Sequence, residues 1–369
     1  MAFGFYKTIL INLIIFCGLF LSLELSYRAW LYFSNCDTFC YNTTFIAKLD
    51  AFDRITAYGF TAPNPILGYS LADGTFKIRE PGWNGATITI RQGVRANPNF
   101  EPASAVGAIL AVGDSFVFGD QVSDDETWPA LLERRLNRRV VNGGVSGYGP
   151  LQAVLRAEQL LKAQTYSLVL LSILVSEDLP RDQWVKGYGD FYRPAVIRED
   201  GRLRYTTVAE SRRIVSDGYF VCAHPWIPEI FFWSHVAKRF FLRLGYDGRC
   251  ISIIHPIAAT VDEILEFGVE QLAALPIDKV ILLQYPRYAF EDVSLARQAV
   301  DEARKIRDAA DRHGLRVIDS YKSLKEQPLS EIYTHSNWPH HSKWGNEVVA
   351  DLIARKIGIM APYTNPHIE

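Results

Sequence analysis

Ser115 lies in the sequence VGDSF, directly after a short apolar run, Ala108 to Val112, that is typical of a strand. Gly113 allows the chain to turn sharply off that strand, which would present the serine at the edge of a sheet beside the start of a helix. A serine hydroxyl is a weak nucleophile that needs an adjacent base. The surrounding residues do not form the GxSxG pattern, and a Gly-Asp-Ser tripeptide alone is a weak signal.

A glycine-dense segment, NGGVSGYG at 142–149, follows the next apolar stretch. Such a segment lets backbone N–H groups converge on one point, as the stabilisation of a developing oxyanion requires. A strand-to-helix turn that needs only positive φ angles would leave the same pattern. Both interpretations stay open on this segment alone.

A histidine that could serve as the base lies near the carboxyl end of the chain, in NWPHHSKWG at 337–345. His340 could reach over the strand ends toward Ser115, and His335 and His341 are rivals for the same role. A lone histidine in a loop is more often a polar surface residue, and this chain has eight histidines.

Alternating strand and helix patterns surround these residues from about residue 106 onward. Apolar runs predict strands at 108–112, 139–142, 167–175, 279–285 and 315–318. Amphipathic stretches predict helices at 127–136, 150–162, 258–275, 294–313 and 343–357. The alternation predicts a parallel sheet covered by helices, with SLVLLSILV at 167–175 as its central strand. Ligands bind at the carboxyl ends of such strands, where Ser115 and the glycine-dense segment lie.

Two segments interrupt this alternation. Residues 34–105 are loop-rich, with ATITIR at 86–91 as a predicted edge strand, and residues from about 181 to 255 are rich in aromatic side chains and are interpreted as an inserted cap. We therefore expect a membrane anchor at 1–33, a loop-rich lead-in at 34–105, and an α/β domain at 106–369.

The anchor is predicted from the apolar run Ile9 to Leu23, which with its neighbours approaches the roughly 20 residues that span a bilayer. No small-x-small cleavage pattern follows it, and Arg28 and Trp30 are typical of a membrane interface. We expect an uncleaved single-pass anchor; a removed signal peptide and a buried soluble helix are the alternatives.

Composition argues against several other classes of function. Charged residues make up 22% of the chain and the net charge is −2, without the basic stripe of a nucleic-acid-binding protein. Cys36, Cys40, Cys222 and Cys250 permit two disulfides in an oxidising compartment, with pairing 36–40 and 222–250 as our choice, and free buried cysteines are equally open. No cysteine has metal-site spacing with a histidine nearby, and we expect neither a metal nor a cofactor.

Taken as an ordered set, these segments resemble the SGNH (GDSL) hydrolase superfamily. The stretch AILAVGDSFVFGDQVSDDETWPALLERRL and the following VVNGGVSGYGPLQ are similar to its first two blocks, and HHSKWGNEVVADLI is similar to its last block. In that block the histidine stands five residues before a glycine, which selects His340 over His341. The upstream NPILGYSLADGTF and TIRQGVR resemble the segment that precedes the domain in membrane-anchored bacterial members. The resemblance covers about residues 63–180 and 275–357.

The resemblance implies a three-layer, flavodoxin-like parallel sheet and a set of roles. Ser115 would be the nucleophile and would also donate its backbone N–H to the oxyanion, Gly147 would supply a second N–H, and His340 would be general base and then general acid. Such enzymes hydrolyse esters through an acyl-enzyme, often by removing acetyl groups from carbohydrates. For an anchored bacterial member, the resemblance implies an inner-membrane protein with its catalytic domain in the periplasm.

Two positions depart from the family pattern. Glu177 stands where the family has an asparagine that donates to the oxyanion, and it could donate only in its neutral form. Asn337 and Trp338 stand where the family has an aspartate before the histidine. Asn337 could hold a histidine tautomer but could not stabilise an imidazolium as a carboxylate does. Asp319, after the last predicted strand, is a possible substitute.

Three functional hypotheses follow. The first is a serine ester hydrolase of the acetylesterase type that acts on an acylated carbohydrate or another small ester. The second, motivated by the two altered positions, is a catalytically impaired relative that binds glycan or scaffolds a membrane assembly. The third is an O-acyltransferase to polysaccharide that works with a membrane acyl-transfer partner, since a sugar hydroxyl can replace water in resolving an acyl-enzyme.

Overall fold

The computed structural model describes residues 12, 16, 18–26, 59–79, 82–98, 107–186, 191–216, 253–254, 257–336 and 339–358. The elements discussed below belong to one unit, Ala51–Val221 with Ser252–Glu369. In the other unit, Met1–Asp50 with Cys222–Ile251, the described residues are 12, 16 and 18–26, and they are helical. Most of the predicted anchor at 1–33 and all five cysteines lie outside the described residues. Within the described part of the chain, no helix combines the length and the apolarity that a membrane span needs.

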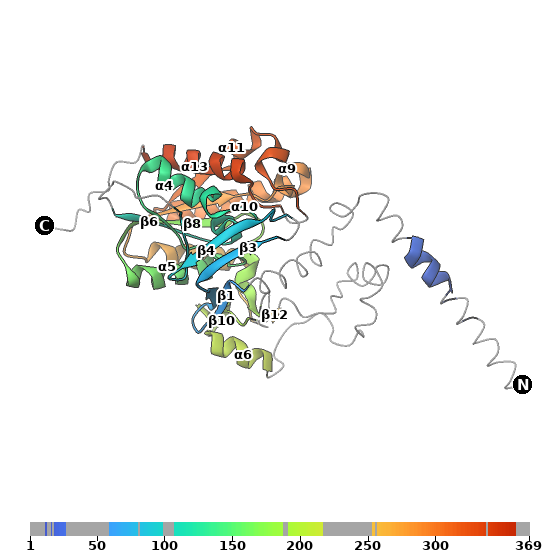
Figure 1. Cartoon of the computed structure of the whole chain (residues 1–369). Coiled ribbons are helices and arrows are strands. Elements are labelled where there is room, and N and C mark those ends of the chain that lie inside the picture. The colour runs from blue at the N-terminus through green and yellow to red at the C-terminus, as the bar shows by residue number, and fades with distance from the viewer. Residues whose placement is uncertain are drawn as a thin grey trace, which may run out of the picture. The chain divides into compact units, whose positions relative to one another are not determined.

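An eight-stranded mixed sheet forms the centre of this unit (Figure 1). Its strands are β3 (Gly74–Ile78), β4 (Ala86–Arg91), β5 (Val94–Arg95), β6 (Ala108–Val112), β7 (Val140–Asn142), β8 (Tyr166–Leu174), β13 (Lys279–Gln284) and β14 (Arg316–Asp319). They lie in the order β14-β13-β8-β6-β7-β5-β4-β3. The five strands β6, β7, β8, β13 and β14 pair in parallel. Their spatial order is that of a flavodoxin-like doubly wound sheet, which the family resemblance implies; the strand–helix alternation by itself predicts only a parallel sheet covered by helices.

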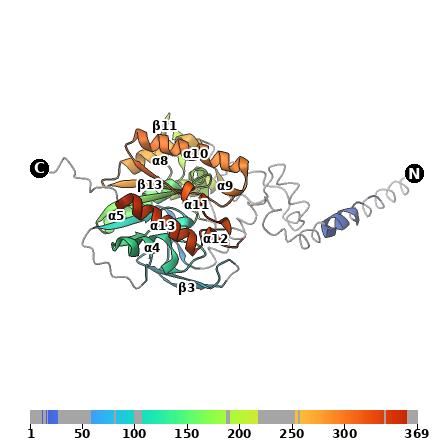
Figure 2. The same cartoon turned by 90° about the horizontal axis from the view of Figure 1, so that it is seen from above.

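Helices cover both faces of the parallel part and complete three layers (Figure 2). On one face α4 (Trp128–Leu136) packs with α13 (Lys343–Gly358). On the other face lie α5 (Pro150–Ala163), α8 (Val261–Ala273) and α10 (Val293–Arg312). The alternation of side chains along a strand explains why two layers are needed. Ile109 and Ala111 of β6 belong to the core under α4 and α13, while Leu110 and Val112 belong to the core under α5.

The observed helices and strands of the parallel part lie close to their predicted bounds, with one instructive difference. The helix predicted at 258–275 is shorter in the structure, where α8 begins at Val261. Thr260 accepts a hydrogen bond from the backbone N–H of Glu263, and the Glu263 side chain accepts from the Thr260 N–H. This reciprocal capping box sets the start of the helix, because it satisfies donors that the first turn leaves without partners.

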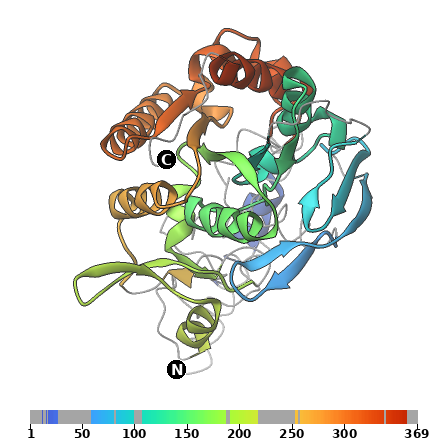
Figure 3. The same ribbon diagram turned by 90° about the vertical axis from the view of Figure 1, so that its left-hand side faces the viewer.

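The lead-in contributes strands to the same sheet rather than a separate layer. β5 pairs antiparallel with β7, β4 with β5, and β3 with β4. Figure 3 shows these blue-to-cyan strands gathered at one edge of the unit. The strand predicted at 86–91 is present as β4, but it is second from the edge. The prediction of an edge position was wrong, because GTFKI of β3 supplies one more strand through its pairing with β4.

The segment interpreted as an inserted cap contains short elements in its described residues. They are η2 (Leu179–Gln183), β9 (Trp184–Lys186), β10 (Val196–Glu199), β11 (Arg202–Tyr205), α6 (Val208–Ser216) and β12 (Ile253–Ile254). β10 and β11 form a hairpin, and β12 pairs with β9. A second small hairpin precedes the main sheet, formed by β1 (Thr61–Asn64) and β2 (Gly68–Leu71). The remaining short helices are α3 (Ser115–Phe118), η1 (Asp124–Glu126), α9 (Tyr288–Glu291), α11 (Tyr321–Lys325) and α12 (Leu329–Ile332).

Candidate active site

Ser115 is the first residue of α3, immediately after the carboxyl end of β6. Gly113 has a φ of 153°, and a Cβ there would lie 2.8 Å from the carbonyl oxygen of Ser172 on β8, so a side chain would not fit. Asp114 caps α3 by accepting a hydrogen bond of 2.9 Å from the backbone N–H of Phe116. As the first residue of the helix, Ser115 has a backbone N–H with no acceptor within the helix, as an oxyanion donor needs.

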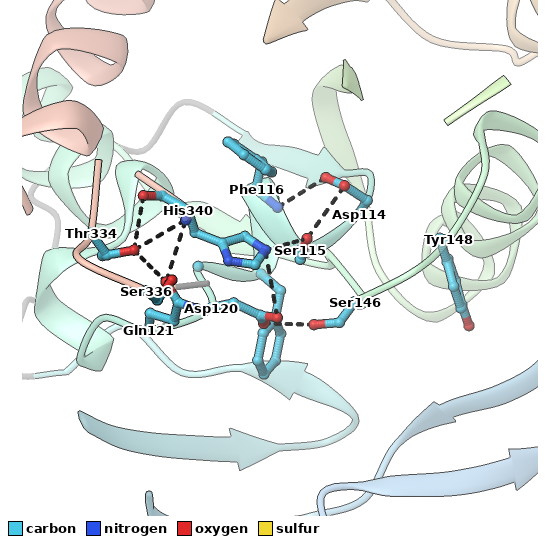
Figure 4. Close-up of polar contacts among 12 residues, drawn as sticks. Asp114, Ser115, Phe116, Asp120, Gln121, Ser146, Tyr148, Thr334, Ser336 and His340 are labelled. Atoms are coloured by element: carbon cyan, nitrogen blue, oxygen red, sulfur yellow. Dashed lines mark hydrogen bonds and ion pairs between the residues drawn. The ribbon is translucent and has the colours of Figure 1, made fainter. Parts of the chain in front are cut away.

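His340 lies directly beside this serine (Figure 4). Its Nε2 atom is 2.9 Å from Ser115 Oγ, across 225 positions of sequence. Both side chains are buried, and the imidazole packs on the ring of Phe116 with 5.0 Å between ring centroids. A neutral imidazole in this position can accept the hydroxyl proton as the oxygen attacks an electrophile.

The loop that carries His340 is held by the side chain of Gln121. Gln121 Oε1 accepts hydrogen bonds from the Thr334 hydroxyl, from the Ser336 hydroxyl at 3.1 Å and from the His340 backbone N–H at 3.3 Å. The Thr334 backbone N–H donates to the His340 carbonyl at 2.9 Å, which closes the loop on itself. Gln121 follows α3 by three residues, so the segment that presents the serine also positions the base.

The two rival histidines lie in different environments. His335 is exposed. His341 is buried between Phe116 and Tyr333, with ring centroids at 4.9 and 5.3 Å, and neither of its ring nitrogens has a hydrogen-bond partner among the described residues. Burial, and secondarily the neighbouring His340, lower the pKa of His341 to about 3. His341 is therefore a neutral packing residue, in agreement with the spacing that selects His340.

Asp120, which the sequence pattern does not single out, is almost fully buried beside Ser115 and His340. Its Oδ2 atom lies 3.8 Å from His340 Nε2, and its Oδ1 atom accepts a hydrogen bond of 2.6 Å from the Ser146 hydroxyl (Figure 4). Burial raises the pKa of Asp120 to about 7, although the Ser146 hydrogen bond and the charge of Arg95 oppose that shift. The only signal in the sequence is its position five residues after Ser115, where it looks like an ordinary turn residue.

The glycine-dense segment lies against the same turn. A Cβ on Gly144 would lie 2.4 Å from the Phe118 backbone nitrogen, so the close approach requires glycine there. Gly147 has a φ of 81°, and its carbonyl accepts from Arg193 Nη1 at 3.1 Å. Through Ser146 and Asp120 this segment is joined to the His340 ring. Gly147 thus directly follows Ser146, the residue of this segment that is hydrogen-bonded to Asp120.

Glu177 is engaged elsewhere. Its Oε1 atom accepts a hydrogen bond of 2.6 Å from the Tyr288 hydroxyl of α9. The structure therefore brings Ser115 and His340 together and directs Glu177 toward α9.

The neighbouring Asp178 belongs to a buried ion network. Arg181 Nη1 donates to Asp178 Oδ1 at 2.5 Å, to Asp114 Oδ2 at 3.2 Å and to the Tyr148 carbonyl at 3.0 Å. Burial raises the pKa of both carboxyl groups, and the Arg181 charge opposes the shift in each. This network ties the end of β8 to the residue that caps α3.

Two further residues complete the comparison with the sequence. Asn337 lies outside the described residues. Asp319 accepts from Arg307 and from the Tyr321 backbone N–H, so its carboxylate is engaged at the end of β14 by other groups than the base. Among the described residues, no three His, Cys, Asp or Glu side chains are grouped as a metal site would require.

No family model and no curated protein matches the chain. Solved structures with a similar arrangement include a member of the lipolytic G-D-S-L family from Veillonella parvula, with 14% identity over 69% of this chain and 99% of that one, at a TM-score of 0.40. A lipase/acylhydrolase from Enterococcus faecalis has 15% identity over 70% of this chain and 100% of that one, at 0.38. An acetylxylan esterase from Geobacillus stearothermophilus has 14% identity over 70% of this chain and 98% of that one, at 0.37. At these identities and TM-scores the matches carry no conclusion about function, which is inferred below from the residues of this chain.

Proposed function

We propose that this protein is a serine ester hydrolase in which Ser115 is the nucleophile and His340 the base. One observation carries the proposal: a buried imidazole nitrogen lies 2.9 Å from a buried serine hydroxyl at the carboxyl end of a parallel strand. In the first step the Ser115 Oγ–H bond breaks, the proton moves to His340 Nε2, and Oγ bonds to the acyl carbon. The backbone N–H groups of Ser115 and Gly147 are the proposed donors to the oxyanion.

The second step returns the enzyme to its starting state. His340 gives its proton to the leaving alcohol, which leaves an acyl-serine. A water molecule then attacks the acyl carbon while His340 accepts the water proton, and the released serine oxygen is reprotonated from His340. The balance needs no metal and no redox partner, because only protons and an acyl group change place.

The substrate class and the location are parts of the same proposal. Acylated carbohydrates are the proposed substrates, with support from the resemblance of the sequence blocks to SGNH hydrolases. The apolar run Ile9 to Leu23 supports an uncleaved single-pass anchor in a bacterial inner membrane, with the catalytic domain outside the cytoplasm. Both would be tested by acetate release from acetylated polysaccharide and by protease accessibility in spheroplasts.

The decisive experiment measures 4-nitrophenyl acetate hydrolysis by the full chain purified in a mild detergent. Wild type should turn over, and Ser115→Ala should lose at least roughly 10³-fold in kcat/KM because the attacking oxygen is gone. Ser294→Ala, which changes an exposed serine in the first turn of α10, is the matched control and should retain wild-type activity. A fluorophosphonate should lose fluoride to Ser115 and leave its phosphonyl group on the tryptic peptide that contains this serine.

The outcomes separate the three hypotheses. If wild type and Ser115→Ala are equally inert and the fluorophosphonate does not label the chain, the hydrolase proposal fails and the glycan-binding hypothesis gains. If the fluorophosphonate labels Ser115 but ester cleavage requires an added carbohydrate acceptor, the acyl group is being transferred to sugar rather than to water.

A further inference from the structure

Asp120 is a buried carboxyl group beside the reacting pair that the resemblance does not include. From the geometry we propose that Asp120 is a positioning residue whose carboxylate stabilises the protonated form of His340 from the Nε2 side. The inference rests on the proposed function, because it assigns a task within the proton transfer between Ser115 and His340.

The backbone fixes Asp120 in this place. Its N–H donates to the Ser115 carbonyl at 3.1 Å, so the residue closes the turn at the end of α3. Gly119 before it has a φ of 86°, and a Cβ there would lie 2.5 Å from Thr127 Cγ2. Arg95 donates to the carbonyl oxygens of Phe118 and Gly119 at 2.7 and 2.6 Å. On this fixed backbone the Asp120 carboxyl group lies between the Ser146 hydroxyl and the His340 ring (Figure 4).

The contact matters only after the proton has moved. Before the reaction, His340 Nε2 lies 2.9 Å from Ser115 Oγ, and the Asp120 oxygen at 3.8 Å is beyond hydrogen-bond distance. Once Nε2 carries the proton, the ring is a cation that faces a carboxylate in a buried site, where charges attract more strongly than in water. The carboxylate thus favours the state that follows proton transfer, and Asp120 itself gains no proton.

Four groups from four segments face Asp120 and set its charge. The Ser146 hydroxyl from the glycine-dense segment and the Arg95 guanidinium from β5 favour the ionised form, and Asp114 from the serine turn disfavours it. His340 from the base loop faces the second oxygen. With burial included, the pKa of Asp120 is raised to about 7. The carboxylate is therefore present above pH 7 and is lost as the pH falls through that value, so its help to His340 disappears on the acidic side.

Two variants test this role by moving the pH profile in opposite directions. Asp120→Asn keeps the size of the side chain and removes the charge. We expect kcat to fall roughly 10- to 100-fold at pH 8, which is the range of an impaired acid–base step. The acidic limb of kcat/KM should move to lower pH, by about one unit, because a ring without a neighbouring carboxylate is protonated less readily.

Ser146→Ala keeps the carboxyl group and removes its donor. Asp120 should then take up a proton at higher pH, and the acidic limb should move upward, by about one unit. Asp182→Asn is the matched control, because Asp182 is also a buried aspartate with a pKa raised to about 7 but contacts the Leu151 N–H rather than His340. Whatever it does to thermal stability, its acidic limb should stay where it is in wild type.

Opposite shifts in the two variants, with an unmoved control, establish the role. If Asp120→Asn labels with fluorophosphonate, keeps its fold by circular dichroism and leaves the acidic limb unmoved, Asp120 is a packing residue and the inference is wrong. If Asp120→Asn does not fold, an unmoved limb in Ser146→Ala overturns it instead. Failure of the proposed function looks different, because then Ser115→Ala would match wild type and no limb would depend on the serine.

Discussion

The carboxyl ends of β6 and β8 lie side by side in the sheet, and both are followed by acidic residues. The polar side chains at the two ends differ in their partners. After β6, Ser115 and Asp120 face the His340 ring, and a proton can pass between the serine and the imidazole. After β8, Glu177 accepts from Tyr288 and Asp178 pairs with Arg181, so these acids are engaged by groups of the protein itself.

This difference shows that a polar residue at the carboxyl end of a parallel strand does not, for that reason alone, take part in a reaction. Both strand ends are at the topological switch point, where ligands bind in open α/β sheets. The end of β6 leaves a hydroxyl and a base in contact with each other. At the end of β8, Arg181 pairs with Asp178 and also with Asp114, which links this strand end to the neighbouring serine turn. The following predictions test this division.

The largest effect is expected at the base. His340→Gln keeps a polar side chain of similar size but cannot take a proton, so kcat/KM for 4-nitrophenyl acetate should fall roughly 10³- to 10⁴-fold. Steady-state kinetics at pH 8 would measure the loss. A variant that keeps a tenth or more of wild-type activity would show that another group acts as base. It would also contradict the assignment of the reaction to the end of β6 alone.

A smaller effect, on stability rather than chemistry, is expected in the ion network. Arg181→Met leaves Asp114 and Asp178 buried without their shared cation, which typically costs about 3–5 kcal/mol of unfolding free energy. Because burial raises the pKa of both carboxyl groups, the loss should grow as the pH rises from 5 to 8, where the unfolded chain is ionised and the folded chain resists ionisation.

Urea unfolding at the two pH values would measure that loss. Met is the chosen substitute because it is long and apolar and keeps most of the buried volume. An equal loss at pH 5 and pH 8 would mean that the network contributes packing and not charge compensation.

The smallest effect is expected at Glu177. Glu177→Gln keeps an oxygen that can accept from the Tyr288 hydroxyl, so hydrolysis should stay within about twofold of wild type if the residue has no part in the reaction. Loss of an oxyanion donor would instead cost about 10²- to 10³-fold in kcat. A loss of that size would place the end of β8 in the chemistry and remove the contrast with β6.

The sequence predicts much of the frame that positions the site. β6 has its predicted bounds, and β8, β13 and α13 differ from theirs by one residue at one or both ends. These elements are long or continuously apolar, so their periodicity is clear. The pairing of Ser115 with His340 is implied by the family resemblance, since the pattern alone leaves His335 and His341 as rivals, and the structure places the two side chains 2.9 Å apart.

The sequence cannot predict the side chains whose direction depends on distant partners. Glu177 sits where the pattern puts it, but Tyr288, 111 positions later, decides where its carboxyl group points. In the sequence, Asp120 and Gln121 look like residues of an ordinary polar turn. Their contacts with His340 form only when the loop near the carboxyl end of the chain packs against this turn. Asn337 lies outside the described residues, and its part in orienting the base stays a prediction.

The strands of the lead-in carry a consequence for where the catalytic unit begins. Arg95 of β5 reaches across to the Phe118, Gly119 and Val122 carbonyls and to Asp124, and thereby supplies the positive charge beneath the serine turn. A chain shortened to start at residue 106 would keep Ser115 and His340 but lose Arg95 and its hydrogen bonds to the serine turn. Strands from the predicted lead-in thus belong to the same sheet and the same unit as the candidate site.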